Sequence, residues 1–288
     1  MNNNYLKATI FAIILGLTTV VSDAQLRTQE NVPVGFYGKV VDQDGRAVAG
    51  ANVSLDFIVS HMDEDRTETK PFTMQTDQDG KFELTGVIGY GIDKFVIQKD
   101  GYQLSKKTLR SYVFGHKTGY KPNHDSPVIF RMWKEAGKEQ LVGSSWHGKV
   151  ACNGTTNRFD LFHGRRSADG SLEIVCTRVP LNLPPANTAP FTWNVQITVV
   201  GGAIQPTNDE FTYLAPETGY LPLLTYGQQA NDPKWDRQMP MPKDYYIKTS
   251  DGHYGHLSLE WDRAFWQSPM IVKWDCSVNP SGSRNLER

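Results

Sequence analysis

The chain has 288 residues, and its 30 basic side chains nearly balance its 31 acidic ones. A protein that binds nucleic acid usually carries a basic face that neutralises phosphates, and no stripe of basic residues occurs in this sequence. The charge balance therefore argues against nucleic acid as a partner, and a chain of this length has room for two domains.

The N-terminal residues have the order of a secretory signal peptide. Lys7 precedes an apolar run over 8–21, and the small residues Ser22 and Ala24 occupy the positions that a signal peptidase reads. This run is shorter than the roughly 20 residues that a membrane span requires. No cysteine stands at the cleavage position, which argues against a lipoprotein anchor. We predict a signal peptide over 1–24, cleavage after Ala24, and a secreted or periplasmic protein that is not an integral membrane protein.

From Pro33 to Lys134 the apolar residues alternate with a period of two, which is typical of strands, and helical periodicity is absent. Turn residues separate the expected strands, which are YGKVV (37–41), ANVSLDFIV (51–59), KFEL (81–84), KFVIQ (94–98) and PVIFRMW (127–133). The polar segment 61–70 is expected to be a solvated loop or an exposed edge. Short strands joined by such turns predict a β-sandwich.

The charged segment 134–146 interrupts this alternation, so we place a domain boundary near residue 138. Strand-like runs then resume at WHGKVAC (146–152), RFDLF (158–162), SLEIVCTRV (171–179), FTWNVQITVV (191–200), EFTYLA (210–215), DYYIKT (244–249), YGHLSLEW (254–261) and MIVKWDC (270–276). Proline-rich stretches between them are expected to be ordered loops. We therefore predict an all-β protein of two β-sandwich domains, over 25–137 and 138–279, followed by an exposed polar tail over 280–288.

The tetrapeptide Asp-Gln-Asp-Gly occurs twice, at 42–45 and 77–80. An EF-hand calcium loop with its glycine at position 6 needs oxygen ligands from position 1 onward and a bidentate glutamate at position 12. Neither copy has a carboxylate at position 1 or 12, where the residues are Val40 and Ala51 in one frame and Gln75 and Gly86 in the other. Asp-Gly is also the preferred sequence of tight hairpin turns. We predict two turns and no calcium site.

Two further patterns resemble metal-ligand pairs. His61 and Glu64 have the H-x-x-E spacing of some zinc peptidases, but they lie in a polar loop with no α/β framework to supply a third ligand. His253 and His256 would share one face of a helix, whereas in a strand their odd spacing directs them to opposite faces. The alternation around them favours a strand. We therefore predict no metal and no cofactor.

No nucleophile motif occurs in the chain. The G-x-S-x-G elbow is absent, and Ser144 and Ser145 are near His147 only in sequence. The phosphate-binding glycine motifs are absent as well. We therefore predict no catalytic residues, and a hydrolase with an unrecognised site around His147, Asp160 and His163 is the least favoured hypothesis.

All three cysteines lie in the second half of the chain, at 152, 176 and 276. An oxidising compartment allows one disulfide with one thiol left over. Cys152 and Cys176 are the preferred pair because both are at the ends of expected neighbouring strands. The alternative is that all three are unpaired and buried.

Six of the seven tryptophans also lie in the second half. Exposed aromatic side chains bind sugars by stacking and anchor protein interfaces. Trp193, Trp261 and Trp274 alternate within expected strands, so we expect them in the core. Trp235 and Trp266 are in or near loops, so they are the candidate ligand-binding residues for a glycan.

Three sequence blocks in the first half follow a pattern that a known family shares. The matching residues are Gly38, Val40, Asp42, Gly45, Val48, Gly50, Ala51 and Val53, then Thr76, Asp77, Asp79, Gly80, Phe82 and Leu84, then Gly101 and Tyr102. On these residues the segment 35–133 resembles the carboxypeptidase regulatory-like domain. Ala47 in place of the usual proline and the acidic insert around 61–70 depart from the pattern. The resemblance implies a transthyretin-like, seven-stranded sandwich that serves as an accessory module without catalytic residues.

These observations predict a non-enzymatic structural or interaction module of the cell envelope or extracellular space, with an envelope protein as the partner. The alternative is a carbohydrate-binding protein that uses aromatic residues of the second domain. The second half resembles C-terminal regions of uncharacterised secreted bacterial proteins, and that resemblance implies architecture without chemistry.

Overall fold

The structure is a computed structural model that describes residues 31–61, 66–105, 107, 111–114, 119–179, 189–236, 241–261 and 269–287. In these residues the regular elements are all β-strands, which confirms the predicted all-β fold. Within the same ranges, no helix has the length and apolarity needed to cross a membrane. The predicted signal peptide over 1–24 lies outside the described residues.

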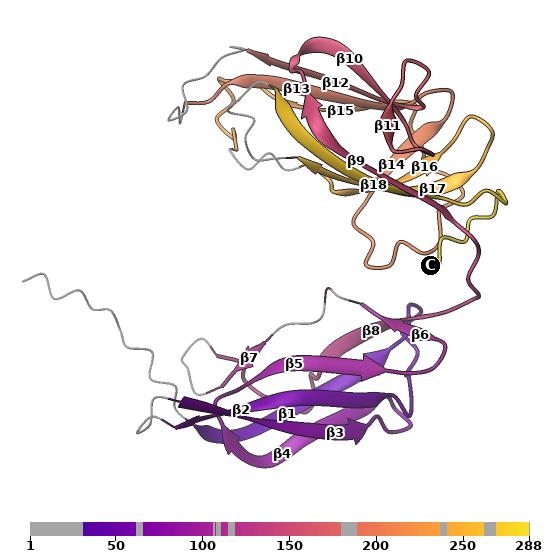
Figure 1. Ribbon diagram of the computed structural model, residues 1–288. Helices are drawn as coiled ribbons and strands as arrows, with labels where there is room; N and C mark the ends of the chain where they lie inside the picture. The colour runs from indigo at the N-terminus through magenta and orange to yellow at the C-terminus, as the bar shows by residue number, and fades with distance from the viewer. Residues whose placement is uncertain are drawn as a thin grey trace, which may run out of the picture.

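The first sandwich contains two four-stranded sheets (Figure 1), with strand orders β4-β1-β8-β6 and β3-β2-β5-β7. Its strands are β1 (Val32–Val41), β2 (Asn52–His61), β3 (Arg66–Gln75), β4 (Lys81–Gly89), β5 (Gly91–Gln98), β6 (Tyr102–Leu104), β7 (Tyr112–Val113) and β8 (Val128–Lys134). Strands β1 and β8 pair in parallel, and the other pairs are antiparallel. The described part thus has eight strands where the resemblance implied seven.

Aromatic side chains fill the space between these two sheets. The rings of Phe36 and Phe95 are 5.2 Å apart, and those of Phe95 and Phe130 are 5.1 Å apart. Gly38 on β1 makes room for another ring, because a Cβ atom at this position would lie 2.2 Å from the ring of Phe82. The alternation of buried and exposed residues along β1 and β2 has the period of two that the sequence indicated.

The second sandwich contains two five-stranded sheets, with orders β11-β10-β12-β13-β15 and β14-β16-β17-β18-β9 (Figure 1). Its strands are β9 (Val142–Val150), β10 (Asn153–Asp160), β11 (Arg165–Arg166), β12 (Leu172–Val179), β13 (Thr192–Val199), β14 (Ala203–Thr207), β15 (Leu224–Gln228), β16 (Asp244–Lys248), β17 (Tyr254–Trp261) and β18 (Met270–Val278). Trp193 and Trp274 are buried in the core and Trp261 packs against it, as predicted.

Most expected strands are present, and the differences have local causes. The segment 210–215 is not a strand, and its one ladder contact is an isolated bridge between Leu214 and Asn285. Strands β14 and β15 were not predicted, because both are short and contain Pro206 or Gly227, which are rare in strands. In the segment 61–70, β3 begins at Arg66 and forms a sheet edge, which confirms the exposed-edge alternative for its second half.

Candidate functional site

Both Asp-Gln-Asp-Gly copies are turns whose first aspartate binds backbone amides. Asp42 Oδ1 accepts hydrogen bonds from the N–H groups of Asp44 at 2.9 Å and Arg46 at 2.8 Å. Asp77 Oδ1 accepts the equivalent bonds from Asp79 and Lys81 at 2.9 and 2.8 Å. Both turn glycines have positive φ, at 80° in the first copy and 73° in the second. The prediction of two turns is confirmed, but each turn leads from a strand of one sheet to a strand of the other, so neither closes a hairpin between paired strands.

Removing divalent cations is therefore expected to leave the fold unchanged. Because a carboxylate oxygen in each turn already accepts two N–H donors, EDTA should shift the melting temperature of the mature chain by less than about 1 °C. Differential scanning fluorimetry with EDTA and with added calcium measures this shift. A drop of several degrees in EDTA that calcium reverses would contradict the turn assignment and restore the calcium hypothesis.

The histidines considered as metal ligands bind separate carboxylates. His256 Nε2 lies 3.1 Å from Asp244 Oδ1, and His253 Nδ1 lies 3.1 Å from Asp251 Oδ2. His61 pairs with Glu68 across the β2–β3 hairpin at 3.1 Å, and Glu64 lies outside the described residues. Over the ranges given above, the structure contains no group of three or more His, Cys, Asp or Glu side chains that could hold a metal ion.

Two residues of the hypothetical hydrolytic site do form a pair. His163 Nδ1 lies 2.7 Å from Asp160 Oδ2, and the N–H groups of Phe162 and His163 donate to Asp160 Oδ1. Burial opposes ionisation of Asp160, but the hydrogen bonds from His163 and Phe162 outweigh it and lower its pKa. His147 lies on β9, where its register partner is Lys273 of β18. The contact between Asp160 and His163 closes the turn after β10. The hydrolase hypothesis remains a prediction.

Trp235 is packed against the second core. Its ring lies 5.4 Å from that of Phe191 in an edge-on arrangement, and its Nε1–H donates to the Phe191 carbonyl at 2.9 Å. The indole is half-buried, so only part of its surface faces solvent. Trp266 lies outside the described residues. Glycan binding by these two residues therefore remains a prediction.

The three cysteines are free thiols in the core of the second sandwich, and the predicted disulfide between Cys152 and Cys176 is not formed there. Cys152 immediately precedes β10, Cys176 lies within β12, and Cys276 lies on β18 of the opposite sheet. This arrangement corresponds to the alternative in which all three cysteines are unpaired and buried.

The C-terminal tail binds the segment between the two sandwiches. Glu287 is buried, and its carboxylate accepts hydrogen bonds from Trp133 Nε1 at 2.6 Å, Ala136 N at 2.8 Å and Gly137 N at 3.0 Å. Leu286 is also buried, in a small cluster with Ala215 and Tyr246. The prediction of an exposed tail is therefore wrong, because the polar tail residues satisfy backbone and indole donors of the connecting segment.

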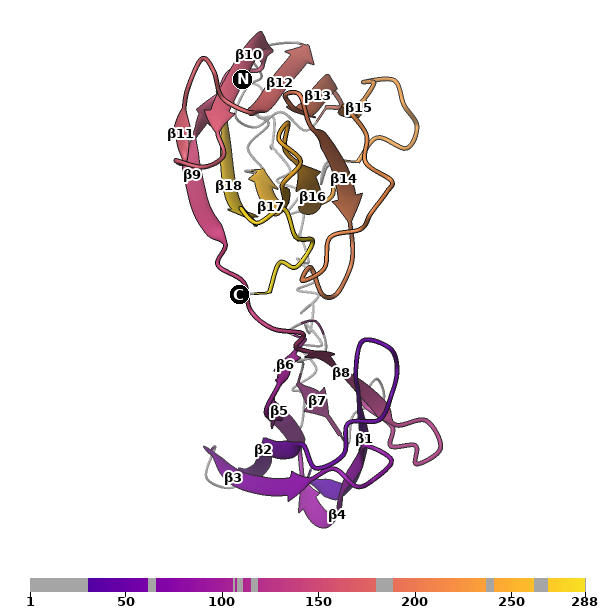
Figure 2. The ribbon, with the colours of Figure 1, turned by 90° about the vertical axis from the view of Figure 1, so that its right-hand side faces the viewer.

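A carboxylate of the connecting segment, that of Glu139, is in turn held by Asn279 and by serines of the tail. Glu139 accepts hydrogen bonds from Asn279 Nδ2 at 3.0 Å and from the hydroxyls of Ser281 and Ser283, both at 2.8 Å. These bonds, with that from Asn279 the largest, lower the pKa of Glu139. In Figure 2 the chain after β18 runs toward the first sandwich, as these contacts require. The tail thus fastens the connection between β8 and β9.

The segment 208–223, here called the leucine loop, joins β14 to β15 and contacts the first sandwich. Lys107 Nζ donates to the carbonyls of Asn208 at 3.0 Å and Asp209 at 2.9 Å. Arg131 on β8 forms an ion pair with Glu210 at 2.9 Å. Because charged side chains of the first sandwich hold one end of the loop, its position is coupled to that sandwich.

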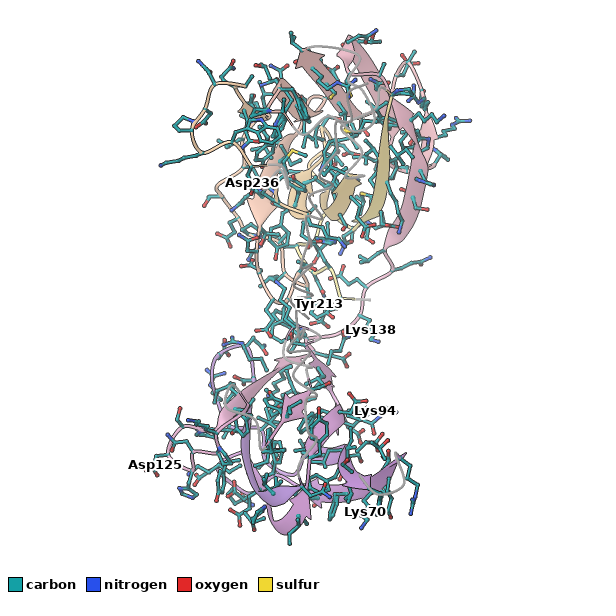
Figure 3. All side chains as sticks on the ribbon, turned by 90° about the vertical axis from the view of Figure 1, so that its left-hand side faces the viewer. Lys70, Lys94, Asp125, Lys138, Tyr213 and Asp236 are labelled. Atoms are coloured by element: carbon teal, nitrogen blue, oxygen red, sulfur yellow. The ribbon has the colours of Figure 1, made fainter. Side chains whose placement is uncertain are left out.

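Aromatic and tail contacts hold the rest of the leucine loop. The ring of Trp133 lies 5.8 Å from Phe211 and 5.6 Å from Tyr213, and Figure 3 shows Tyr213 between the two sandwiches. From the tail, Arg284 Nη1 donates to the Ala215 carbonyl at 3.0 Å. The loop is therefore positioned by both sandwiches although it has no strand structure of its own.

Three leucines of this loop face solvent. Leu214, Leu221 and Leu223 are 48%, 49% and 43% exposed, whereas the other large apolar side chains exposed in the described ranges are scattered along the chain. Exposed apolar side chains are found at interaction surfaces when one partner covers them together. The sequence prediction placed Leu214 in an expected strand over 210–215 and did not consider Leu221 or Leu223. The prolines at 216 and 222 were the available signal that this segment is a loop, since proline cannot donate a hydrogen bond to a strand ladder.

Comparisons of the chain with protein-family models, curated proteins and solved structures give no match. The functional argument therefore depends on the residues and contacts described above.

Proposed function

We propose that this chain is an exported, non-enzymatic interaction module that binds a protein of the cell envelope through the leucine loop. The observation that supports this most directly is that one loop exposes three leucines, Leu214, Leu221 and Leu223, to solvent. Burying one leucine side chain in an interface contributes about 1.5–3 kcal/mol, so a partner that covers all three would gain a substantial part of its binding free energy from them. The signal-like N terminus supports export.

The anchoring of the loop also favours a binding role. A preformed surface loses less conformational entropy on binding than a free loop does. The contacts from Lys107, Arg131 and Arg284 hold the loop main chain and Glu210, while the leucine side chains stay outside. A protein partner with an apolar surface and flanking charges fits this arrangement better than a glycan does, because leucines offer no flat ring for stacking on a sugar.

The first sandwich is proposed to be the accessory module that the sequence resemblance implies. Its supporting features are the Asp-Gly turns at 42–45 and 77–80 and the close fit of Gly38 against Phe82. In this proposal the first sandwich supports the leucine loop through Trp133 and Arg131. The recognition surface then belongs to the second sandwich, and the first one positions it.

Replacing the three leucines with serine is expected to abolish partner capture. In a pull-down from envelope extract, the triple variant at 214, 221 and 223 should retain at most about a tenth of the partner that the wild-type chain retains. The matched control is Ile88→Ser with Val179→Ser, which removes two exposed apolar side chains, 64% and 66% exposed, that lie elsewhere on the chain.

The control should capture the partner as the wild type does, and all three proteins should melt within a few degrees of one another. Equal capture by the triple variant would overturn the proposal. Binding to a glycan array that is lost in Trp235→Ala would instead support the carbohydrate-binding alternative.

A further inference from the structure

A groove opens at one end of the first sandwich, where β5 ends and the chain turns back into β6 (Figure 1). Its volume is about 600 Å³, within the roughly 300–1,000 Å³ of sites that hold small ligands. Its lining includes Asn52 of β2 and, from the end of β5 into β6, Gln98, Lys99, Asp100 and Tyr102. Because β5 and β6 belong to different sheets, the walls of the groove come from both sheets of the sandwich.

The polar side chains of the groove have unused hydrogen-bonding capacity. In the part of the chain that the structure describes, no hydrogen bond or ion pair reaches the side chains of Gln98 and Asp100, and both residues are exposed. Asn52 Oδ1 accepts a bond from Gln75 Nε2 at 2.9 Å, while its Nδ2 has no acceptor within the same ranges. Amide side chains both donate and accept, whereas a carboxylate only accepts. The groove therefore offers donors and acceptors side by side.

The charges of the groove cancel, and an aromatic ring lies among its polar groups. Lys99 and Asp100, which are adjacent in the chain, are the charged side chains among the described lining residues, and their charges are opposite. A phosphate or a metal ion would find no net counter-charge here. Tyr102 is half-buried, and its ring offers apolar surface beside the amides. The matching ligand is uncharged, has groups that both donate and accept, and has an apolar face that can lie on a ring.

The turn that carries these groups is held in place. Tyr102 N donates to the Lys99 carbonyl at 3.0 Å, and Glu135 N donates to the Gly101 carbonyl at 2.8 Å. Gln103 Nε2 also donates to Glu135 Oε1 at 2.6 Å. A site that is already ordered loses less conformational entropy when a ligand binds. The segment between the two sandwiches thus helps to preform the groove.

We propose that this groove binds a neutral carbohydrate. The side chains of Asn52, Gln98 and Asp100 bind sugar hydroxyls, which both donate and accept, and the ring of Tyr102 lies against an apolar face of the sugar. An extended peptide fits less well, because it binds main chain to main chain along a strand edge, whereas the open groups of this groove are side chains. The site is separate from the leucine loop and does not depend on it.

A glycan array probed with the mature wild-type chain tests the ligand class. The array carries neutral oligosaccharides of glucose, mannose, galactose, xylose and N-acetylglucosamine, with acidic glycans beside them. We expect binding to neutral oligosaccharides. Binding to none of the glycans, or to the acidic ones alone, would overturn the proposal.

Substitutions in the groove test the location of the site. Gln98→Ala combined with Asp100→Ala should weaken binding of the tightest neutral oligosaccharide of the array at least about tenfold by isothermal titration calorimetry, because the hydrogen bonds of two side chains are lost. The variant should melt with the wild type, since neither side chain has a partner in the described ranges. The matched control is Gln78→Ala with Asp79→Ala, which removes an exposed amide and an exposed carboxylate outside the groove and should bind as the wild type does.

The same calorimetry separates this site from the other surfaces of the molecule. The triple leucine variant at 214, 221 and 223 should bind the oligosaccharide as the wild type does, so the two binding sites can fail independently. Unchanged affinity in the Gln98 and Asp100 double variant would overturn the proposal. A simultaneous loss of binding in Trp235→Ala would then place the glycan on the second sandwich.

Discussion

Gly80→Ala is expected to destabilise the first sandwich by about 4 kcal/mol, whereas Gly45→Ala should cost about 1 kcal/mol. The two glycines occupy the same position of identical tetrapeptides and have similar positive φ values, 73° and 80°. An alanine is strained in this backbone conformation, so both changes carry the same local cost. The difference between them arises from what surrounds each turn.

The turn at Gly80 lies against β1. A Cβ atom on Gly80 would come within 2.4 Å of the Val40 carbonyl oxygen and 3.1 Å of the Val48 amide nitrogen. Those two backbone atoms are hydrogen-bonded to each other at 3.0 Å, and Val40 N also donates to the Gly80 carbonyl at 2.7 Å. Alanine at 80 would therefore displace main chain that cannot move aside, whereas a Cβ on Gly45 meets no atom within 4 Å.

Urea unfolding of the two variants beside the wild type measures the difference. Near-ultraviolet circular dichroism of the full chain follows the aromatic residues of both cores, so Gly80→Ala should move part of the unfolding signal to lower urea and leave the rest in place. Equal destabilisation by the two substitutions would contradict the packing argument, because local backbone strain alone would then explain both.

Glu287→Ala is expected to cost about 3 kcal/mol and to uncouple the two sandwiches. The substitution leaves Trp133 Nε1 and the amides of Ala136 and Gly137 without their acceptor in a part-buried setting. A buried donor that loses its charged acceptor keeps its desolvation cost, and water does not fully replace the lost hydrogen bond. The tail should then detach from the connecting segment, and the leucine loop should lose part of its support.

Calorimetry of the full chain provides the measurement. The wild type should unfold with the sandwiches coupled, and Glu287→Ala should separate the two transitions. The control is Glu217→Ala, which removes a carboxylate that is 72% exposed and forms only a surface ion pair with Arg284. Such pairs contribute little to stability, so the control should stay within about 1 kcal/mol of wild type. If both variants unfold alike, the buried carboxylate does not join the sandwiches.

The predictable part of the fold is the part that local pattern encodes. Alternation with a period of two identified most of the long strands, since each must present one face to a core. The segment 210–215 has the same alternation yet forms no strand. Its aromatic residues Phe211 and Tyr213 pack on Trp133, nearly eighty residues earlier in the chain. In the sequence, an aromatic residue that packs between the two sandwiches cannot be distinguished from one that faces a core.

The candidate site was less predictable for a related reason. Sequence reasoning chose Trp235 as an exposed platform because it lies among polar and proline residues, but its N–H finds the Phe191 carbonyl and its ring packs there. The exposed leucines 214, 221 and 223 gave no sequence signal of their own, because leucine is usually buried. Exposure depends on whether a partner surface is available, and only the folded chain shows that.

The sequence by itself determined the all-β character of this protein and the two Asp-Gly turns, because both depend on residues within a few positions of one another. Tertiary structure alone decided that Gly80 is packed and Gly45 is free, although their tetrapeptides are identical. It also decided that Glu287, near the end of a polar tail, is buried against Trp133. Burial and close contact arise from segments far apart in the chain, and no local pattern records which segments will meet.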